Sequence, residues 1–366
     1  MPDAFACTVR DSRGPIPEIQ AESFSVQVRC APAPSSTPKG SSKIPPRILS
    51  DQYINIFFQE WAPLLPVLHR PTFLRVYEQY LAEPGAGKWQ GNKQAVAQLF
   101  LIFDIAAVSS ISCITQSTTS YESQWRKAMH SMPSAASLST IQCHVLAQLY
   151  YLLKADYARC VRHRAVAIAM CHQLGLHHSQ KHYTLNSLEL ETRKKVFWCQ
   201  YTLDKYVMVS ALELKSDNMA RFISASSGFP TILREFDIST EYPADVDDEN
   251  LTEQGISPAL PGELTKMSSA LALFRICRIL SRALDQLLPA SASYLFSMKN
   301  FQSISDELDQ WLQSIPTHLR MQFLNDKPST GVVSDRSPLL VWKSRCTFAI
   351  ALTYLSSRSP TSTSAV

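Results

Sequence analysis

The stretch that decides the fold is ELETRKKVFWCQYTLDKYV, residues 189–207. Glu189 and Arg193, like Glu191 and Lys195, stand four residues apart in the acid-before-base order that stabilises an α-helix. Ser187 stands just before the stretch, where a helix N-cap is expected. The same stretch supplies a large apolar surface, from Val196, Phe197, Tyr201, Leu203 and Tyr206. We therefore predict one long helix over residues 188–209.

A pair of helices precedes this stretch. Ser139 and Gln142 have the spacing of a capping box and open a helix. A second helix runs from about residue 158 and ends at Gly175, because glycine adopts the left-handed conformation common at helix C-termini. We predict that the two helices form an antiparallel hairpin over residues 139–175. The apolar faces of this hairpin consist of Ile141, Val145, Leu149, Leu152, Val161, Ala165, Ile168, Ala169 and Leu174.

The rest of the chain shows the same helical periodicity. Helices are predicted near residues 48–57, 73–81, 95–114, 121–130, 263–287 and 300–314, and from about residue 338. Alternation of the strand type is nearly absent. The predicted fold class is all-α, an irregular multi-helix bundle with antiparallel helix hairpins.

Composition sets the domain boundaries. Of 366 residues, 45% are hydrophobic and 18% charged, which favours a sizeable folded core. Residues 1–46 contain many prolines mixed with Ser, Thr and Gly, and we interpret them as a disordered leader or linker. A helical domain is expected over residues 47–355, with a Ser/Thr-rich disordered tail over residues 356–366. The apolar stretch 95–114 contains Asp104, so we expect a buried core helix there and no membrane span.

The sequence contains no motif that carries catalysis or binds a cofactor, and we predict that the protein is not an enzyme. The nine cysteines are scattered, no signal peptide is visible, and reduced thiols are expected. Cys160 with His163, and Cys171 with His172, could hold a metal, but buried thiols and rim histidines are the favoured interpretation. Residues 245–249 are expected to form a solvated acidic loop, and the basic residues of 159–164 and 193–195 to form solvated helix faces.

Four segments carry a resemblance to a known family. They are FFQEWAPLLPVLHRPTFLRVYEQY (57–80), ARCVRHRAVAIAMCHQLGLHH (158–178), residues 189–207, and GFPTILREFDISTEYPADVDDE (228–249). In this order they resemble the fungal-specific transcription factor domain, or middle homology region, of the fungal zinc-cluster transcription factors. The resemblance covers about residues 48–320. Its motif residues are Pro63, Pro66, His69, Pro71, Phe73, Arg193, Phe197, Trp198, Tyr201 and Asp204.

The resemblance implies structural roles for these motif residues, and none in catalysis, cofactor binding or metal binding. Pro66 and Pro71 would fix turns. His69 would bond a nearby backbone group, and Asp204 would pair with a basic residue. Trp198 and Tyr201 would anchor helix packing.

The resemblance also implies a function. It suggests the regulatory domain of a nuclear transcription regulator that controls RNA polymerase II transcription. Full-length family members carry zinc in a six-cysteine cluster, whereas this chain has only Cys7 and Cys30 in its first hundred residues. DNA is therefore expected as a partner only by family or through a second protein, and regulation through a homodimer, a heterodimer or a small-molecule effector is expected.

Two points depart from the family pattern or leave it open. Residues 211–227 read as an unusual insertion between the third and fourth segments. The helix hairpin on its own also leaves open an alternative function, a helical protein-interaction scaffold outside transcription.

Overall fold

The computed structural model describes residues 45–82, 92–109, 120–181, 183–213, 232–257, 264–287 and 298–316, with Leu319 and two residue pairs at 323–324 and 327–328. These residues belong to the second of two units, Met1–Lys43 and Ile44–Val366. The predictions for residues 1–44, for most of 211–227, for the helix near 338 and for the tail 356–366 lie outside the described ranges.

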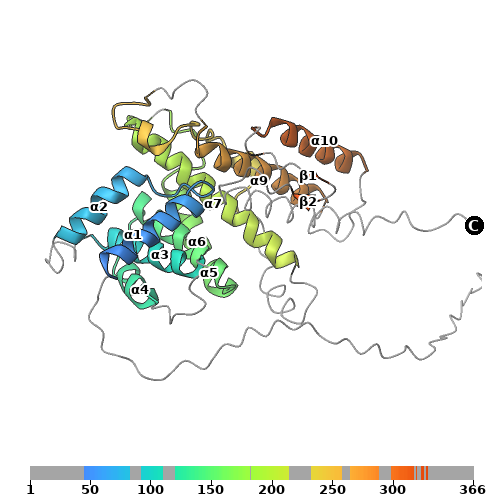
Figure 1. The fold of residues 1–366 in the computed structure, drawn as a ribbon. Helices are drawn as coiled ribbons and strands as arrows, with labels where there is room; N and C mark the ends of the chain where they lie inside the picture. Colours follow the sequence, from blue (N-terminus) through green and yellow to red (C-terminus); the bar gives the residue numbers. More distant parts are fainter. Residues whose placement is uncertain are drawn as a thin grey trace, which may run out of the picture. The chain divides into compact units, whose positions relative to one another are not determined.

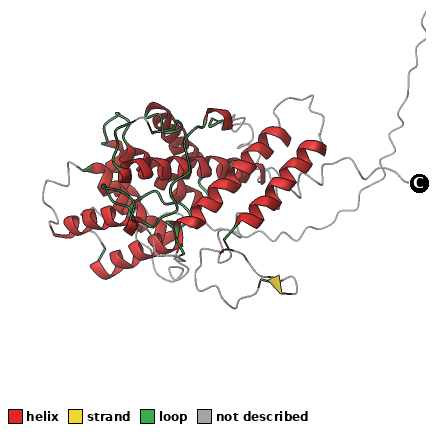
Figure 2. Ribbon diagram, turned by 90° about the horizontal axis from the view of Figure 1, so that it is seen from above, coloured by secondary structure: helices red, strands yellow, loops and turns green. Residues whose placement is uncertain are grey.

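The described part of the chain is helical, which confirms the predicted fold class (Figures 1 and 2). One short antiparallel hairpin, β1 (Phe323–Leu324) with β2 (Lys327–Pro328), is the exception among these residues. The helices, in chain order, are α1 (Arg47–Ile56), the π-helix η1 (Phe57–Trp61), α2 (Arg70–Ala82), α3 (Lys93–Ser109), α4 (Glu122–His130), α5 (Leu138–Leu153), α6 (Tyr157–Gln173), α7 (Ser187–Glu213), the 3-10 turns η5 (Glu235–Asp237) and η6 (Asp248–Asn250), α9 (Met267–Leu287) and α10 (Met298–Ser314).

Helix α3 forms the centre of the main core. Its residues from Leu99 to Ala107 are all buried, and α1, α4 and α5 pack around it. A helix that is apolar on every side is typical of a protein core or a membrane span. No helix within the described ranges is both long and apolar enough to span a bilayer. The described part of the 95–114 stretch is therefore a core helix, as expected.

Helices α5 and α6 pack together as the predicted hairpin. Gly175, with φ of +63°, ends α6 in a Schellman motif, in which Leu176 N–H donates to the Cys171 carbonyl at 2.9 Å. The predicted start of α5 was wrong by two residues. The N-cap is Ser137, whose hydroxyl accepts from Thr140 N–H at 3.2 Å.

The predicted Gln142 partner of that cap is instead buried. Its side-chain amide donates to the Val67 carbonyl at 2.8 Å and ties α5 to the segment before α2. Helix α7 also begins differently from the prediction. Asn186, and not Ser187, accepts from the first-turn Glu189 N–H at 2.7 Å. Asn and Ser are nearly equal as N-caps, so neighbouring candidates are hard to rank from sequence.

A second, smaller core lies between α9 and α10. Ile304, Leu308 and Trp311 of α10 pack against Ile279 and Leu280 of α9. The Trp311 indole also donates to the Ala272 carbonyl at 3.0 Å. Leu273 packs against both cores, so α9 connects the small core to the main one.

Candidate functional site

The site where the family-like segments meet is built around Asp248. One oxygen of its carboxylate accepts from Lys195 Nζ on α7 at 2.8 Å. The other accepts from the backbone N–H of Arg70, the first residue of α2, at 2.9 Å. A carboxylate at a helix N-terminus is stabilised by the helix dipole and by the unpaired N–H groups there. Asp248 thus joins two helices that are far apart in the sequence.

His69 strengthens the same junction. Its Nε2 lies 2.8 Å from the backbone carbonyl of Asp248, and its Nδ1 lies 2.8 Å from the Thr72 hydroxyl. Because a carbonyl only accepts, Nε2 is the nitrogen that donates, and a neutral ring then accepts from Thr72 at Nδ1. Arg70 adds an exposed ion pair to Glu249 at 3.2 Å.

We call residues 245–249, with these partners, the acidic latch. Its other acids are also bonded: Asp247 accepts from Lys266 N–H at 2.8 Å, and Asp245 accepts from the Thr265 hydroxyl. Burial raises the pKa of Asp247 above its ordinary value. The prediction of a solvated loop therefore holds only in part, because Val246, Asp247 and Asp248 are half-buried. Only Asp245 and Glu249 are exposed.

The latch also corrects the predicted pairing within α7. Lys195 was expected to pair with Glu191, but its side chain is only 4% exposed and bonds to Asp248. Glu191 instead accepts from Lys194 at 2.8 Å and from Ala244 N–H at 2.7 Å. Glu189 and Arg193 do pair as predicted, at 3.4 Å.

The proline and aromatic residues of the first segment support the latch. Pro63 and Pro66 line a small cavity of about 50 Å³ together with Lys195 and Asp248. Pro71 lies in the first turn of α2, where a missing N–H removes no helical bond. The ring of Phe73 is buried 5.6 Å from that of Phe58.

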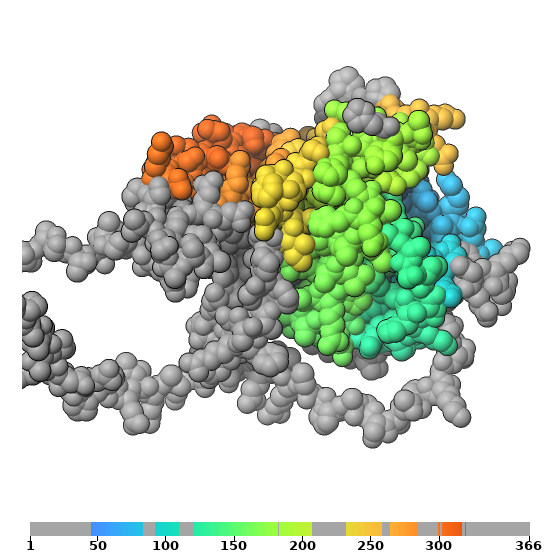
Figure 3. Space-filling model, turned by 180° about the vertical axis from the view of Figure 1, so that it is seen from behind, coloured from blue at the N-terminus to red at the C-terminus, as the bar shows by residue number. Residues whose placement is uncertain are grey.

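Two aromatic residues of α7 hold the segment that leads into the latch. Trp198 is fully buried, stacks on Tyr242 at 4.5 Å and donates to the Glu241 carbonyl at 3.0 Å. The Tyr201 hydroxyl donates to Glu235. Burial raises the pKa of Tyr201, so this hydroxyl keeps its proton. Figure 3 shows the yellow segment that contains Glu235 lying along the green helix α7.

A buried ion cluster lies one turn further along α7. Asp204 pairs with Arg164 of α6 at 2.5 Å and with Lys205 at 3.4 Å, and all three side chains are at most 3% exposed. Lys205 also donates to the Leu233 carbonyl at 2.9 Å. Arg164 and Lys195 were expected on solvated faces, and that expectation is wrong. Helical phase alone did not show that other segments cover them.

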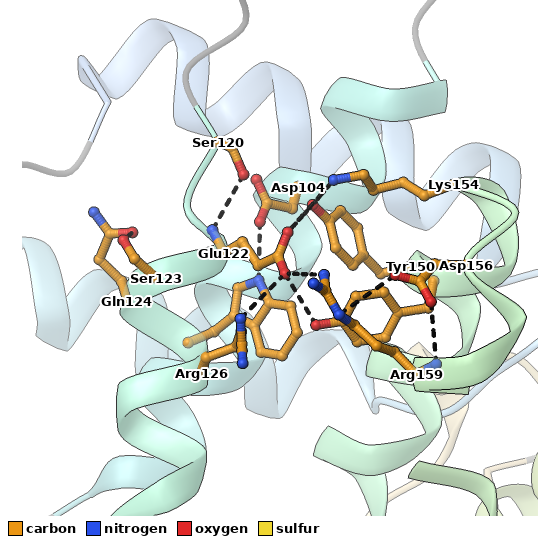
Figure 4. A network of polar contacts seen from close by, with 12 residues as sticks. Asp104, Ser120, Glu122, Ser123, Gln124, Arg126, Tyr150, Lys154, Asp156 and Arg159 are labelled. Atoms are coloured by element: carbon orange, nitrogen blue, oxygen red, sulfur yellow. Dashed lines mark hydrogen bonds and ion pairs between the residues drawn. The ribbon is translucent and has the colours of Figure 1, made fainter. Parts of the chain in front are cut away.

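A separate polar network surrounds Glu122, the first residue of α4 (Figure 4). Glu122 accepts from the hydroxyls of Tyr150 and Tyr151, and it pairs with Arg159 at 3.0 Å and Lys154 at 3.4 Å. Burial opposes its charge, but the contacts with Lys154 and the two tyrosines outweigh burial and lower its pKa. The network ties α4 to the α5–α6 hairpin.

Asp104 lies beneath this network and is 2% exposed. Its carboxylate accepts from Trp125 Nε1 at 2.9 Å and from Tyr121 N–H at 2.8 Å. Burial raises its pKa to about 6 despite these two bonds.

The residues considered for metal binding have other contacts. Cys160 is buried and donates to the Gln148 carbonyl at 3.6 Å. His163 lies 3.0 Å from His144, nitrogen to nitrogen, and burial lowers the pKa of both to about 4. Cys171 is also buried, and burial raises the pKa of its thiol to about 12. Within the described ranges, no three His, Cys, Asp or Glu side chains come together as a metal site.

The motif residues therefore gather at two places. Pro63, Pro66 and His69 lie at the latch, and Trp198, Tyr201 and Asp204 lie along α7 where it contacts α6 and residues 233–242. Sequence reasoning missed Lys195, Asp248 and Arg70 as the residues that join them. The one signal for Asp248 was its place in the run of acids that ends the fourth family-like segment.

Comparison with known proteins gives the family. The model of the fungal specific transcription factor domain matches residues 54–210 and 219–313. The transcriptional activator protein acu-15 of Neurospora crassa is 41% identical over 92% of this chain and 34% of its own length. An ABC-transporter-regulating transcription factor of Aspergillus fumigatus is 24% identical over 81% of this chain and 31% of its own. Activator of stress genes 1 of Saccharomyces cerevisiae is 23% identical over 75% of this chain and 28% of its own.

The chain thus spans about a third of the length of the curated relatives it matches. No solved structure matches it. The family model covers well over half of the chain, and its two matched blocks contain every motif residue that forms the latch and the α7 contacts. The chain belongs to the fungal specific transcription factor domain family and is a regulatory region of a fungal transcription factor.

Proposed function

We propose that this chain tunes RNA polymerase II transcription of its target genes in the nucleus by switching between a latched and an unlatched state. The relatives are named as transcription factors, so binding and not catalysis is the proposed mode of action. The proposed domain boundaries are 1–46 for a leader, 47–355 for the regulatory domain with an insertion at 211–227, and 356–366 for a tail.

The acidic latch is the observation that carries this proposal. It joins α2, α7 and η6 through charged hydrogen bonds, at a place where residues far apart in the sequence meet. The latch consists of a few charge-assisted hydrogen bonds at a partly exposed position. If one partner leaves, the other charged groups lose their partners as well, so the junction is suited to be either fully formed or fully open. A partner or ligand that favours one state would shift the population of both.

Contact with DNA is proposed from the family, directly or through a partner in a homodimer or heterodimer. Zinc would enter through the six-cysteine cluster that full-length family members carry. A small-molecule effector is the other proposed input, and it would act on the described helical body.

The test is a transcription assay in a fungal host. The whole chain is placed between a heterologous DNA-binding domain and an activation domain, and reporter transcript is measured. We expect the chain to lower reporter output and Asp248→Asn to restore it. Glu253→Gln is the matched control, since Glu253 is an exposed acid outside the latch. Fusion abundance is measured in each strain, and a fluorescent fusion checks that the protein enters the nucleus.

A second variant separates the latch from general destabilisation. Glu122→Gln loosens the network that ties α4 to α5 and α6, and the side-chain bonds of Glu122 go to residues outside the latch. Restored output in Asp248→Asn but not in Glu122→Gln supports the latch as the switch. Equal output with and without the chain, together with a location outside the nucleus, would instead support the alternative of a helical scaffold outside transcription.

A further inference from the structure

A second pocket, distinct from the small cavity at the latch, opens where helices α2, α3, α5 and α7 begin. Its volume is about 310 Å³, within the range of small-molecule sites. Leu68, Phe73 and Ala95 form a buried apolar part of its wall. Thr72, Asn92, Ser139 and Asn186 are exposed and line its opening.

The polar groups of this pocket are amides and hydroxyls. Gln142 is buried among them, and Gln98 donates to its side-chain oxygen at 3.1 Å. Side-chain amides and hydroxyls both donate and accept hydrogen bonds. Such a wall matches a ligand whose own groups also do both, as alcohol hydroxyls do.

The charge of the pocket is balanced. No lysine or arginine is among the described residues that line it. Glu189 is its one carboxylate and is paired with Arg193 at 3.4 Å. Asn92 and Asn186 accept from first-turn N–H groups of α3 and α7, at 3.1 and 2.7 Å, so those helix starts offer fewer free donors to an anion. An ion would lose its hydration here without a countercharge.

We propose that this pocket binds an uncharged, polyhydroxylated small molecule, and that binding favours the latched state. The apolar wall covers the carbon skeleton of the ligand, and the amides and hydroxyls bond its alcohol groups. The regulatory part of this inference rests on the proposed function.

His69 connects the pocket to the latch. It lines the pocket, shares a hydrogen bond with Thr72 at the pocket opening, and donates to the Asp248 carbonyl on its other side. A ligand that orders Thr72 and His69 therefore holds Asp248 in place against Arg70. This contact is a direct physical route from the pocket to the switch.

The binding experiment uses the whole 366-residue chain and four probes of similar size. D-glucose and myo-inositol are uncharged, gluconate is an anion and glucosamine is a cation. Calorimetric titration is expected to show a Kd on the order of millimolar for at least one uncharged probe, since ligands this small bind weakly. Gluconate and glucosamine are expected to bind at least about tenfold more weakly.

Two tryptophan variants locate the site. Ser139→Trp places a large ring at the pocket opening, and Ser123→Trp places one on an exposed face of α4 as the control. Ser139→Trp is expected to weaken binding at least about tenfold while its circular dichroism and melting curve match the control. Absence of binding by both uncharged probes, tighter binding of a charged probe, or undiminished binding by Ser139→Trp would each overturn the assignment.

Amide hydrogen exchange tests the link to the latch. Exchange of the Arg70 N–H, which is bonded to Asp248, is expected to slow when the uncharged probe binds. Binding that leaves this exchange unchanged would refute the coupling but not the pocket. Because neither measurement uses transcription, failure of the reporter assay and failure of this inference are separate results.

Discussion

Replacing Asp248 with asparagine should cost more stability than the loss of any exposed acid in this chain. The substitution keeps the size of the side chain and one carbonyl oxygen, but it removes the charge that faces Lys195. That lysine side chain is 4% exposed and would be left with an unpaired buried charge. The Arg70 N–H would also lose an anionic acceptor at the start of α2.

The size of the effect follows from these contacts. Breaking a fully buried ion pair by removing one partner costs about 3–5 kcal/mol. The Asp248 side chain is 17% exposed, so water screens part of this interaction and the lower half of that range applies. Loss of the charge at the helix N-terminus adds about 0.5 kcal/mol. We expect Asp248→Asn to lower the free energy of unfolding by about 4 kcal/mol.

Urea unfolding followed by circular dichroism measures this change as a lower midpoint with an unchanged slope. Glu253→Gln removes an exposed acid and is expected to change the free energy of unfolding by less than about 0.5 kcal/mol. The double variant Lys195→Met with Asp248→Asn removes the stranded charge. It should be more stable than Asp248→Asn alone by at least about 1 kcal/mol, because the two residues are energetically coupled.

Two results would refute this reasoning. If Asp248→Asn and Glu253→Gln have the same unfolding midpoint, the latch contributes nothing beyond surface charge. If Lys195→Met and Asp248→Asn have additive effects, the contact at 2.8 Å is not an energetic pair.

Three further predictions concern single positions. Gly175→Ala should lower the free energy of unfolding by about 1–2 kcal/mol, because φ at this position is +63°. Backbone strain is the cause and not a clash, since the added methyl group meets nothing closer than the Tyr183 hydroxyl at 4.0 Å. Thermal unfolding measures the change, with Gly175→Asn as the control because asparagine tolerates this conformation better. Burial raises the pKa of Asp104 from 3.8 to about 6, so the folded state holds this proton more tightly and stability is lost as pH rises from about 4 to 6. Relative to Asp104→Asn, the wild type should lose about 3 kcal/mol of unfolding free energy across that window in urea titrations. Parallel pH profiles of the two proteins would contradict this assignment. The pKa of Glu122 is lowered, so the stability that this residue contributes is present above the ordinary pKa of 4.5 and is lost as pH falls. Glu122→Gln should lower the free energy of unfolding by about 1–2 kcal/mol at pH 7 and by less at pH 3. An effect that does not depend on pH would show that the ion pairs of Glu122 contribute nothing to stability.

Local patterns in the sequence predicted the helices well, because each helix depends on nearby residues. The hairpin of α5 and α6 and its end at Gly175 followed from spacing and from one glycine. Errors at the starts of α5 and α7 arose where two residues close in the sequence can both cap a helix. Ser137 and Asn186 were the residues whose side chains met the free N–H groups.

The site could not be predicted in the same way, because its contacts are between residues distant in sequence. Lys195 has an acid, Glu191, at the favoured spacing within its own helix, and only the fold shows that Lys195 pairs with Asp248 and Glu191 with Lys194. Arg164 is one of several arginines on α6, and it pairs in the core with Asp204, which lies 40 residues further along the chain. Family resemblance pointed to Pro63, His69 and Asp204, but it did not reveal which residues they contact.

The latch has a consequence for the order in which the protein is made. The N–H of Arg70 bonds to the carboxylate of Asp248, which is synthesised 178 residues later. At about 5–20 residues per second, a ribosome needs roughly 10–40 seconds to synthesise that interval. During this time the first turn of α2 emerges without its anion, and Pro63, Pro66 and Phe58 lack the segment that later covers them. Phe58, Pro63 and Pro66 are thus accessible to chaperones during this interval, and they are covered only after residues 246–249 have left the ribosome.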